Sequence, residues 1–388
     1  MSTAFSKRID KALLDRASRS LTRTLTPLQG GNTTELIRGG RKLVNFSSND
    51  YLGLANDTEL IEAWQHGLSL YGCGSAASPM VTGFSQAHAS LESILCEWLG
   101  FDRAILFSSG FSANQALLFT MLEKQDTVYQ DKLNHASLME AGLLSPATMR
   151  RFRHNDTRHL STLLDLNEHE MSGSLVVTEG VFSMDGDVAP LYEMNNAING
   201  RAWLAVDDAH GIGVLGSEGQ GSCSAQGIKP DVLIVTFGKA FGLSGAAILC
   251  NESTGDYLTQ FARHHVYSTA MPPAQAHALT HATTMIQTQH WRREKLIELK
   301  TIFNESLKDF EQVVETKTPI NPIIIGRAEQ ATKLALELNE KGFGVTAIRT
   351  PTVPSNQSRL RVTLSAAHSI EQVTKLSSCL NTTLQGVA

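Results

Sequence analysis

Lys239 and Asp207 each follow a short apolar run that is typical of a buried strand, Val232–Thr236 for the lysine and Leu204–Val206 for the aspartate. An isolated lysine is more often a solvated surface residue, and an aspartate at this position often caps the next turn. Together the two residues suit pyridoxal phosphate, because that cofactor needs an amine for its imine and a carboxylate beside its ring nitrogen. The pair therefore predicts an aldehyde-cofactor enzyme.

Polar residues follow the other predicted strands too. The turn Ser109–Phe111 opens a helix, and backbone amides at a helix start favour a phosphate, although an ordinary helix cap is the alternative interpretation. An imidazole after a strand can stack on a flat ring or bind a phenolic oxygen, or it can be purely structural. Such residues converge on the ligand crevice of a parallel sheet. The candidates are His135, Glu179, Ser183 and His210.

Strands and helices alternate through the middle of the chain. This alternation predicts an α/β fold in which helices cover both faces of a mostly parallel sheet. The predicted strands are Arg103–Phe107, Thr127–Gln130, Leu175–Thr178, Trp203–Val206, Val232–Thr236 and Ala246–Cys250, and the helices include Gln86–Leu99 and Ser112–Met121.

Two flanks enclose this body. Apolar spacing predicts an N-terminal helix over Ile9–Leu25, and Lys42–Ser47 is a short predicted strand. A charged helix connects the body to the last part of the chain. The pattern there, of strands interspersed with helices, predicts a small α+β domain. We expect residues 1–50 to form the N-terminal segment, 51–288 the large domain and 289–388 the C-terminal domain. The C-terminal elements are Ile323–Ile325, Ala331–Lys341, Val345–Ile348, Leu360–Leu364 and Ile370–Leu384.

Composition excludes several classes of protein. The 388 residues are 42% hydrophobic and carry a formal net charge of -5, which argues against nucleic acid or an anionic membrane as the main partner. No apolar run approaches the roughly 18 residues of a membrane span, and the charged start does not look like a secretory signal. The five cysteines are scattered without a Cys-x-x-Cys pair, so no metal site is expected. The expected compartment is the cytoplasm.

Several runs in this order are similar to one family. They are Asn45 to Leu54, Ser109–Phe111, Thr178–Gly186, Val206–Gly211 and Thr236–Gly242. The chain resembles the α-oxoamine synthases along nearly its whole length. These are fold-type I, pyridoxal-phosphate-dependent acyltransferases that condense an amino acid with an acyl thioester. The resemblance implies a homodimer with shared active sites.

The resemblance also assigns roles. Lys239 would form the imine and then act as the general base, while Asp207 would pair with the ring nitrogen. The cofactor ring would lie against His135, with its phenolic oxygen near Ser183 and His210. Its phosphate would be held by Gly110, Phe111 and Thr236, with Thr269 reaching the partner subunit's phosphate. The substrate-binding residues would be Arg361 for the amino-acid carboxylate and Arg23 and Thr352 for the acyl group.

Within the family, the segments Thr346–Pro354 and Arg359–Leu364 look most like the branch of biotin synthesis that uses L-alanine and a pimeloyl thioester. The acyl carrier is left open between coenzyme A and a carrier protein. A glycine C-acetyltransferase, a 5-aminolevulinate synthase or a fold-type I aminotransferase would keep the same lysine and aspartate. A non-catalytic interaction subunit would have no need of a buried amine at Lys239.

Overall fold

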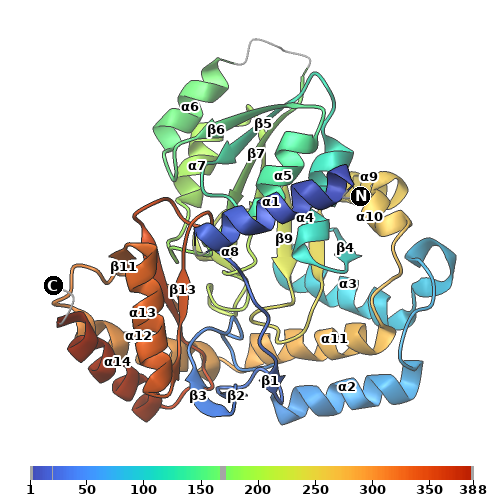
Figure 1. Cartoon of the computed structure of the whole chain (residues 1–388). Coiled ribbons are helices and arrows are strands. Elements are labelled where there is room, and N and C mark those ends of the chain that lie inside the picture. The colour runs from blue at the N-terminus through green and yellow to red at the C-terminus, as the bar shows by residue number, and fades with distance from the viewer. Residues whose placement is uncertain (1–2, 20, 167–171, 386–388) are drawn as a thin grey trace.

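The computed structural model describes residues 3–19, 21–166 and 172–385. A seven-stranded sheet, ordered β4-β10-β9-β8-β7-β5-β6, lies at its centre (Figure 1). β10 runs antiparallel to β4 and β9, and the other neighbouring strands are parallel. The predicted, mostly parallel α/β sheet is thus confirmed. Its strands are β4 (Arg103–Phe107), β5 (Thr127–Asp131), β6 (Thr148–Phe152), β7 (Ser174–Glu179), β8 (Trp203–Asp207), β9 (Val232–Thr236) and β10 (Ala246–Cys250).

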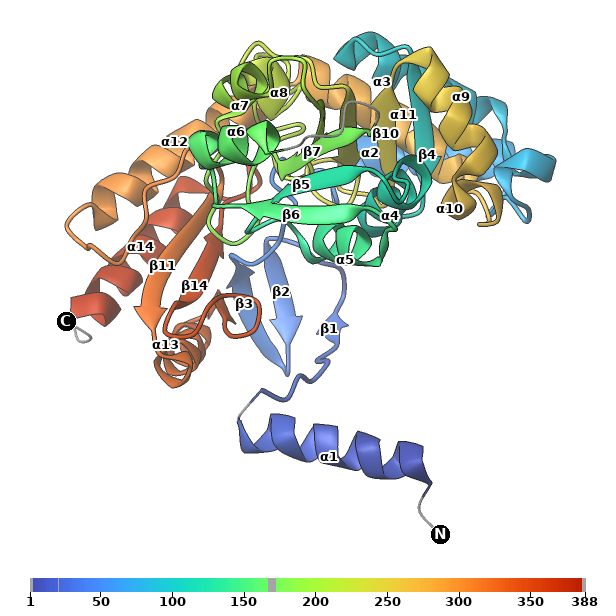
Figure 2. The same cartoon turned by 90° about the horizontal axis from the view of Figure 1, so that it is seen from above.

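Successive strand residues point to opposite faces of this sheet, and each face has its own buried core. Val176 and Val206 belong to the larger core, and Val177 and Ala205 belong to the smaller one. α4 (Gly110–Met121), α5 (Ala136–Leu144) and α9 (Glu252–Phe261) contribute to the smaller core. The larger core takes side chains from α3 (Gln86–Leu99), α6 (Thr157–Asp165), α7 (Leu191–Ile198), α8 (Ser222–Ala225) and α11 (Pro273–Thr288). Helices therefore cover both faces (Figure 2).

The C-terminal region forms a second layer beside the large sheet. α12 (Trp291–Leu307) leads into the three-stranded antiparallel sheet β11-β14-β13, which packs with two helices. The elements are β11 (Ile320–Gly326), α13 (Ala328–Glu340), β13 (Thr346–Ile348), β14 (Ser358–Thr363) and α14 (Ile370–Gln385). Three further helices are α2 (Thr58–Tyr71), which adds Leu60 to the larger core, the short π-helix Pro79–Gly83 and the short α10 (Arg263–Val266).

The N-terminal residues join this C-terminal layer. β1 (Leu28–Gln29), β2 (Glu35–Arg38) and β3 (Arg41–Asn45) form a sheet with β12 (Phe343–Gly344), which pairs in parallel with β3. The sequence did not predict β1 and β2. This sheet brings the N-terminal segment and the C-terminal region into contact. The division of the chain into domains at residues 50 and 288 stays a prediction.

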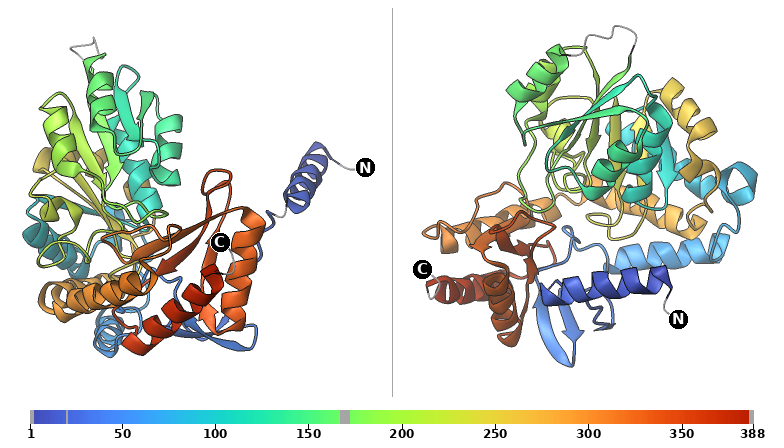
Figure 3. Two further views of the ribbon diagram at one scale, coloured as in Figure 1. Left: turned by 90° about the vertical axis from the view of Figure 1, so that its left-hand side faces the viewer. Right: turned by 45° about the horizontal axis from the view of Figure 1, so that its top comes forward.

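The N-terminal helix is shorter than expected. α1 spans Ala4–Ser18, stands away from the rest of the chain (Figures 2 and 3) and contains no buried residue. The prediction that helix continues to Leu25 is wrong. Three threonines in Thr22–Thr26 disfavour helix because β-branched side chains lose rotamer freedom there, and no core contact compensates. Within the described ranges, no helix is long and apolar enough to cross a membrane.

Candidate active site

The carboxyl ends of the parallel strands open into a cavity of about 290 Å³. Seven of the residues to which the family resemblance assigns a role line it: Gly110, Phe111, His135, Asp207, His210, Thr236 and Lys239. They come from the ends of β8 and β9 and from the starts of α4 and α5, because each of these side chains follows a buried strand. The cavity is also lined by Asn49, Ser108, Ser109, Asn114, Glu179, Ala209, Gly238, Ser244 and Gly245. Among the described residues, no cluster of His, Cys, Asp and Glu could hold a metal ion.

Asp207 is fixed at the base of the cavity by two donors. Asn114 donates to its Oδ2 over 2.7 Å, and the backbone amide of Ala209 donates to its Oδ1 over 3.1 Å. The neighbouring Asp208 has a different position, since both of its oxygens accept hydrogen bonds from Ser222. Asp207 is therefore the carboxylate that the strand end presents to a ligand.

Lys239 follows β9 in a tight turn and lies among charged neighbours. Burial of its amine lowers the pKa below the ordinary lysine value, and the nearby Asp207 and Glu179 partly oppose this effect. Burial raises the pKa of Glu179 well above its usual value, and Asp207 raises it further. The Oε1 atom of Glu179 is buried without a hydrogen-bond partner. Burial thus shifts both groups toward their neutral forms, an uncharged amine for Lys239 and a protonated carboxyl for Glu179.

Two histidines lie on the cavity wall. His135 caps the N-terminus of α5, and its Nδ1 is 2.8 Å from the hydroxyl of Ser137. The Nδ1 of His210 is 2.7 Å from the hydroxyl of Tyr51. Burial lowers the pKa of both histidines, and the nearby Lys239 lowers that of His210 further, to well below its usual value. Both rings are therefore neutral at physiological pH.

One end of the cavity suits a phosphate. α4 begins at Gly110, and the amides of its first turn that lack an intrahelical partner favour an anion at this end. The hydroxyl of Thr236 is buried and lacks a hydrogen-bond partner. A Cβ at Gly110 would lie 2.6 Å from the methyl group of Thr236, so only glycine allows this close approach. An unused donor beside a helix N-terminus fits the phosphate of pyridoxal phosphate.

Arg361 enters the site from β14. Its Nε donates to the carbonyl of Ser183 over 2.6 Å, and its Nη1 donates to Asn49 over 3.1 Å. Its Nη2 lies 3.4 Å from the hydroxyl of Tyr51. The guanidinium therefore lies beside the cavity, close to Asn49 on its wall. Ser183 contributes its carbonyl oxygen here, whereas its predicted contact with the cofactor stays a prediction.

Besides Ser183 and Arg361, three more predicted residues lie outside the cavity lining of this single chain. Thr269 is exposed and lines a small neighbouring hollow together with Ser108. Arg23 is exposed in the extended segment after α1, and Thr352 is exposed in the turn between β13 and β14. The structure does not bring these three side chains together, and their roles stay predictions.

Sequence reasoning missed residues that hold the predicted ones in place. Asn114 received no role, although a polar amide within the apolar helix 113–118 is a signal for a buried hydrogen bond. Asn49 and Tyr51 lie in the run Asn45 to Leu54 that carries the family resemblance, and the sequence assigns neither of them a role of its own. Their contacts with Arg361 span about 310 residues of sequence and cannot be inferred from local spacing.

The fold and the site together define a fold-type I pyridoxal-phosphate enzyme. The family model described as aminotransferase class I and II matches residues 41–380. The chain is also similar to solved structures of this class. Serine palmitoyltransferase from S. paucimobilis, solved with bound pyridoxal phosphate and myriocin, superposes with a TM-score of 0.93 at 26% identity, and the match covers 98% of each chain.

Relatives with a closer sequence specify the branch. The 8-amino-7-oxononanoate synthase of Vibrio cholerae is 63% identical over 377 residues, which is 97% of each protein. A crystal structure of 8-amino-7-oxononanoate synthase from Francisella tularensis is 32% identical, covers 88% of this chain and 99% of that one, and has a TM-score of 0.75. The chain belongs to the 8-amino-7-oxononanoate synthases, a family of pyridoxal-phosphate-dependent acyltransferases.

Proposed function

We propose that this enzyme condenses L-alanine with a pimeloyl thioester, giving 8-amino-7-oxononanoate, carbon dioxide and a free thiol for biotin synthesis. The relatives' names and the site both support this assignment. The observation that carries it is the meeting of Lys239 and Asp207 in one cavity beside the α4 N-terminus. When bound, pyridoxal phosphate withdraws electrons from the Cα atom of an attached amino acid.

The residues at the two ends of the cavity hold the cofactor. Asp207, held by Asn114, keeps a carboxylate available for a protonated ring nitrogen. Thr236 and the first amides of α4 donate to the phosphate, and Gly110 leaves room for the methyl group of Thr236 beside them. These contacts fix the ring relative to Lys239, so the amine stays within reach of the reacting carbon.

Lys239 moves the proton at the reacting carbon. Its lowered pKa shifts the amine toward its neutral form, and a neutral amine accepts the proton from Cα of alanine. Arg361 binds the alanine carboxylate, because a planar guanidinium matches its two oxygens. This carboxylate leaves as carbon dioxide after the new carbon–carbon bond has formed, which makes the condensation irreversible.

The active enzyme is a homodimer in this proposal. Two large apolar side chains, Phe111 on the cavity wall and Tyr267 two residues before Thr269, are 40% and 78% exposed in the single chain, and a second subunit would cover them. Thr269 would then reach the partner subunit's phosphate, and Arg23 and Thr352 would face the acyl group. The cytoplasm stays the predicted location.

An absorbance and thiol-release assay tests the function. We expect a visible cofactor band that shifts when L-alanine is added, and free thiol that appears only after pimeloyl-CoA follows. Glycine with acetyl-CoA is the paired control. Thiol release with the control pair alone would reassign the substrates, and the absence of a cofactor band would refute the role of Lys239.

A further inference from the structure

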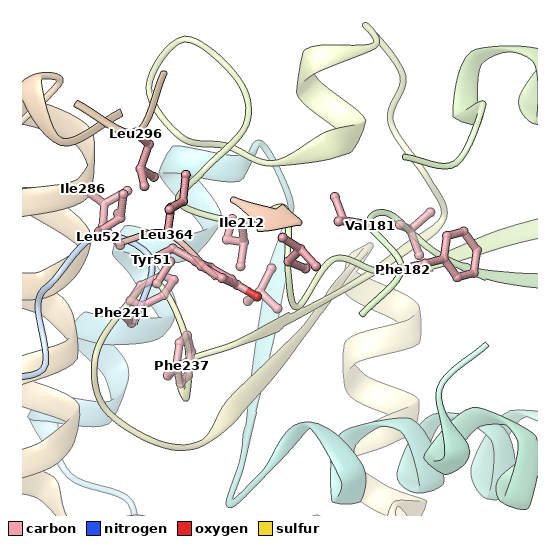
Figure 4. Close-up of a cluster of buried hydrophobic side chains, with 14 of the residues drawn as sticks. Tyr51, Leu52, Val181, Phe182, Ile212, Phe237, Phe241, Ile286, Leu296 and Leu364 are labelled. Carbon is pink, nitrogen blue, oxygen red and sulfur yellow. The ribbon is translucent and has the colours of Figure 1, made fainter. Parts of the chain in front are cut away.

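Tyr51 joins two parts of the site that the sequence keeps far apart. Its ring is fully buried in the larger core beside Leu52 and Phe241, as Figure 4 shows. Its hydroxyl lies 2.7 Å from Nδ1 of His210 and 3.4 Å from Nη2 of Arg361. One phenol thus contacts both the histidine of the cavity wall and the arginine assigned to the substrate carboxylate.

Which of these groups can donate and which can accept a hydrogen bond decides the direction in which the hydroxyl of Tyr51 donates its proton. A guanidinium only donates, so the phenol oxygen accepts from Arg361. His210 is neutral because burial lowers its pKa, and one of its ring nitrogens is therefore an acceptor. The phenol has two possible acceptors, Nδ1 of His210 at 2.7 Å and Oδ1 of Asn49 at 3.2 Å. An O–H donor favours the shorter contact.

This assignment fixes the tautomer of His210. If Nδ1 accepts the phenol proton, the ring proton must be on Nε2. His210 lines the cavity, so Nε2–H becomes a donor toward a ligand there. The opposite tautomer would present a lone pair and would repel the phenolic oxygen of the cofactor.

We propose that Tyr51 is a positioning residue for the reaction, whose hydroxyl holds His210 in the tautomer with the proton on Nε2 and holds Arg361 in place for the substrate carboxylate. The proposal rests on the proposed function for its substrate. Arg361 keeps two other partners, Asn49 and the carbonyl of Ser183. Loss of the phenol hydroxyl therefore loosens the guanidinium without releasing it.

Tyr51→Phe tests this role because phenylalanine keeps the buried ring and removes only the hydroxyl. We expect kcat/KM for L-alanine to fall about 10- to 100-fold, mostly through a higher KM, because a buried hydrogen bond to a charged group is lost. Tyr129→Phe is the matched control, since Tyr129 is also fully buried but does not line the cavity. Its KM for L-alanine should stay at the wild-type value.

A second readout does not depend on catalysis. Protein labelled with ¹⁵N-histidine, prepared without cofactor, reports the tautomer of His210, and its signals are assigned by their loss in His210→Gln. We expect the proton on Nε2 in the wild type and in Tyr129→Phe, and a mixture of tautomers in Tyr51→Phe.

Two results would overturn the proposal. One is a wild-type His210 with its proton on Nδ1, and the other is a Tyr51→Phe enzyme whose KM for L-alanine equals that of the wild type. Failure of the proposed function gives a different pattern, because the wild type would then release no thiol with L-alanine and pimeloyl-CoA. The tautomer result would still support or refute the part of the proposal that concerns His210.

Discussion

Replacing His154 with glutamine will make the stability of the protein less sensitive to alkaline pH. His154 follows β6 and lies between two carboxylates, with Nδ1 2.9 Å from Asp131 and Nε2 2.8 Å from Asp187. Burial of the ring opposes its protonation, but the hydrogen bonds and charges of the two aspartates outweigh burial and raise the pKa of His154 to about 10.

The sign of the effect follows from this raised pKa. An unfolded histidine has a pKa of about 6.5, so the stabilisation by charged His154 is complete below that pH. It declines as the pH rises toward the folded pKa of about 10 and is lost above it. Between these limits the folded state binds one more proton than the unfolded state, and stability falls by about 1.4 kcal/mol per pH unit.

The slope of the unfolding free energy against pH is set by the one extra proton that folded His154 binds. It does not depend on the exact pKa of folded His154 as long as that pKa lies above about pH 9. From pH 7 to pH 9 the wild type should lose about 2.7 kcal/mol relative to His154→Gln. His154 is 27% exposed and Asp187 is 35% exposed, so solvent screening lowers the total worth of the two ion pairs. Glutamine keeps a hydrogen-bond donor and removes the titrating group.

Urea unfolding at pH 7, 8 and 9, at fixed protein and cofactor concentrations, measures the difference between the two proteins. His281→Gln is the control, because His281 forms an exposed pair with Glu59 at the surface. Its curve should run parallel to that of the wild type. The reasoning is refuted if the His154→Gln and wild-type stabilities also change in parallel from pH 7 to pH 9.

Three further substitutions test the site. Lys239→Ala should abolish thiol release and the lysine-linked cofactor band while the thermal midpoint of the cofactor-free protein stays near the wild-type value; retained turnover would contradict the role of the lysine. Asn114→Leu should weaken cofactor binding about tenfold, because Asp207 loses a charge-assisted hydrogen bond, and an unchanged Kd in a cofactor titration would contradict this. Gly110→Ala should also raise the cofactor Kd, since its methyl group meets Thr236, whereas Gly74→Ala, at an exposed glycine with no atom within 4 Å of the added Cβ, should not.

The sequence predicted the elements whose signals are local. Val232–Thr236 and Leu204–Val206 are apolar runs long enough for buried strands, and the lysine and the aspartate follow them directly. β6 was missed because Arg150 and Arg151 interrupt its apolar pattern, yet these charges suit its place at the edge of the sheet. The extent of α1 was wrong because no tertiary contact supports its predicted end.

Sequence alone determined the cofactor chemistry of this protein, because Lys239, Asp207 and Gly110 each stand at a fixed offset from a strand that directs them to one sheet edge. Only the tertiary structure decided the contacts of Tyr51, Asn114 and Arg361 with that site. These contacts join residues that are separated by dozens to hundreds of positions. Their hydrogen bonds depend on how β14, α4 and the turn after β3 pack together, and no local pattern encodes that packing.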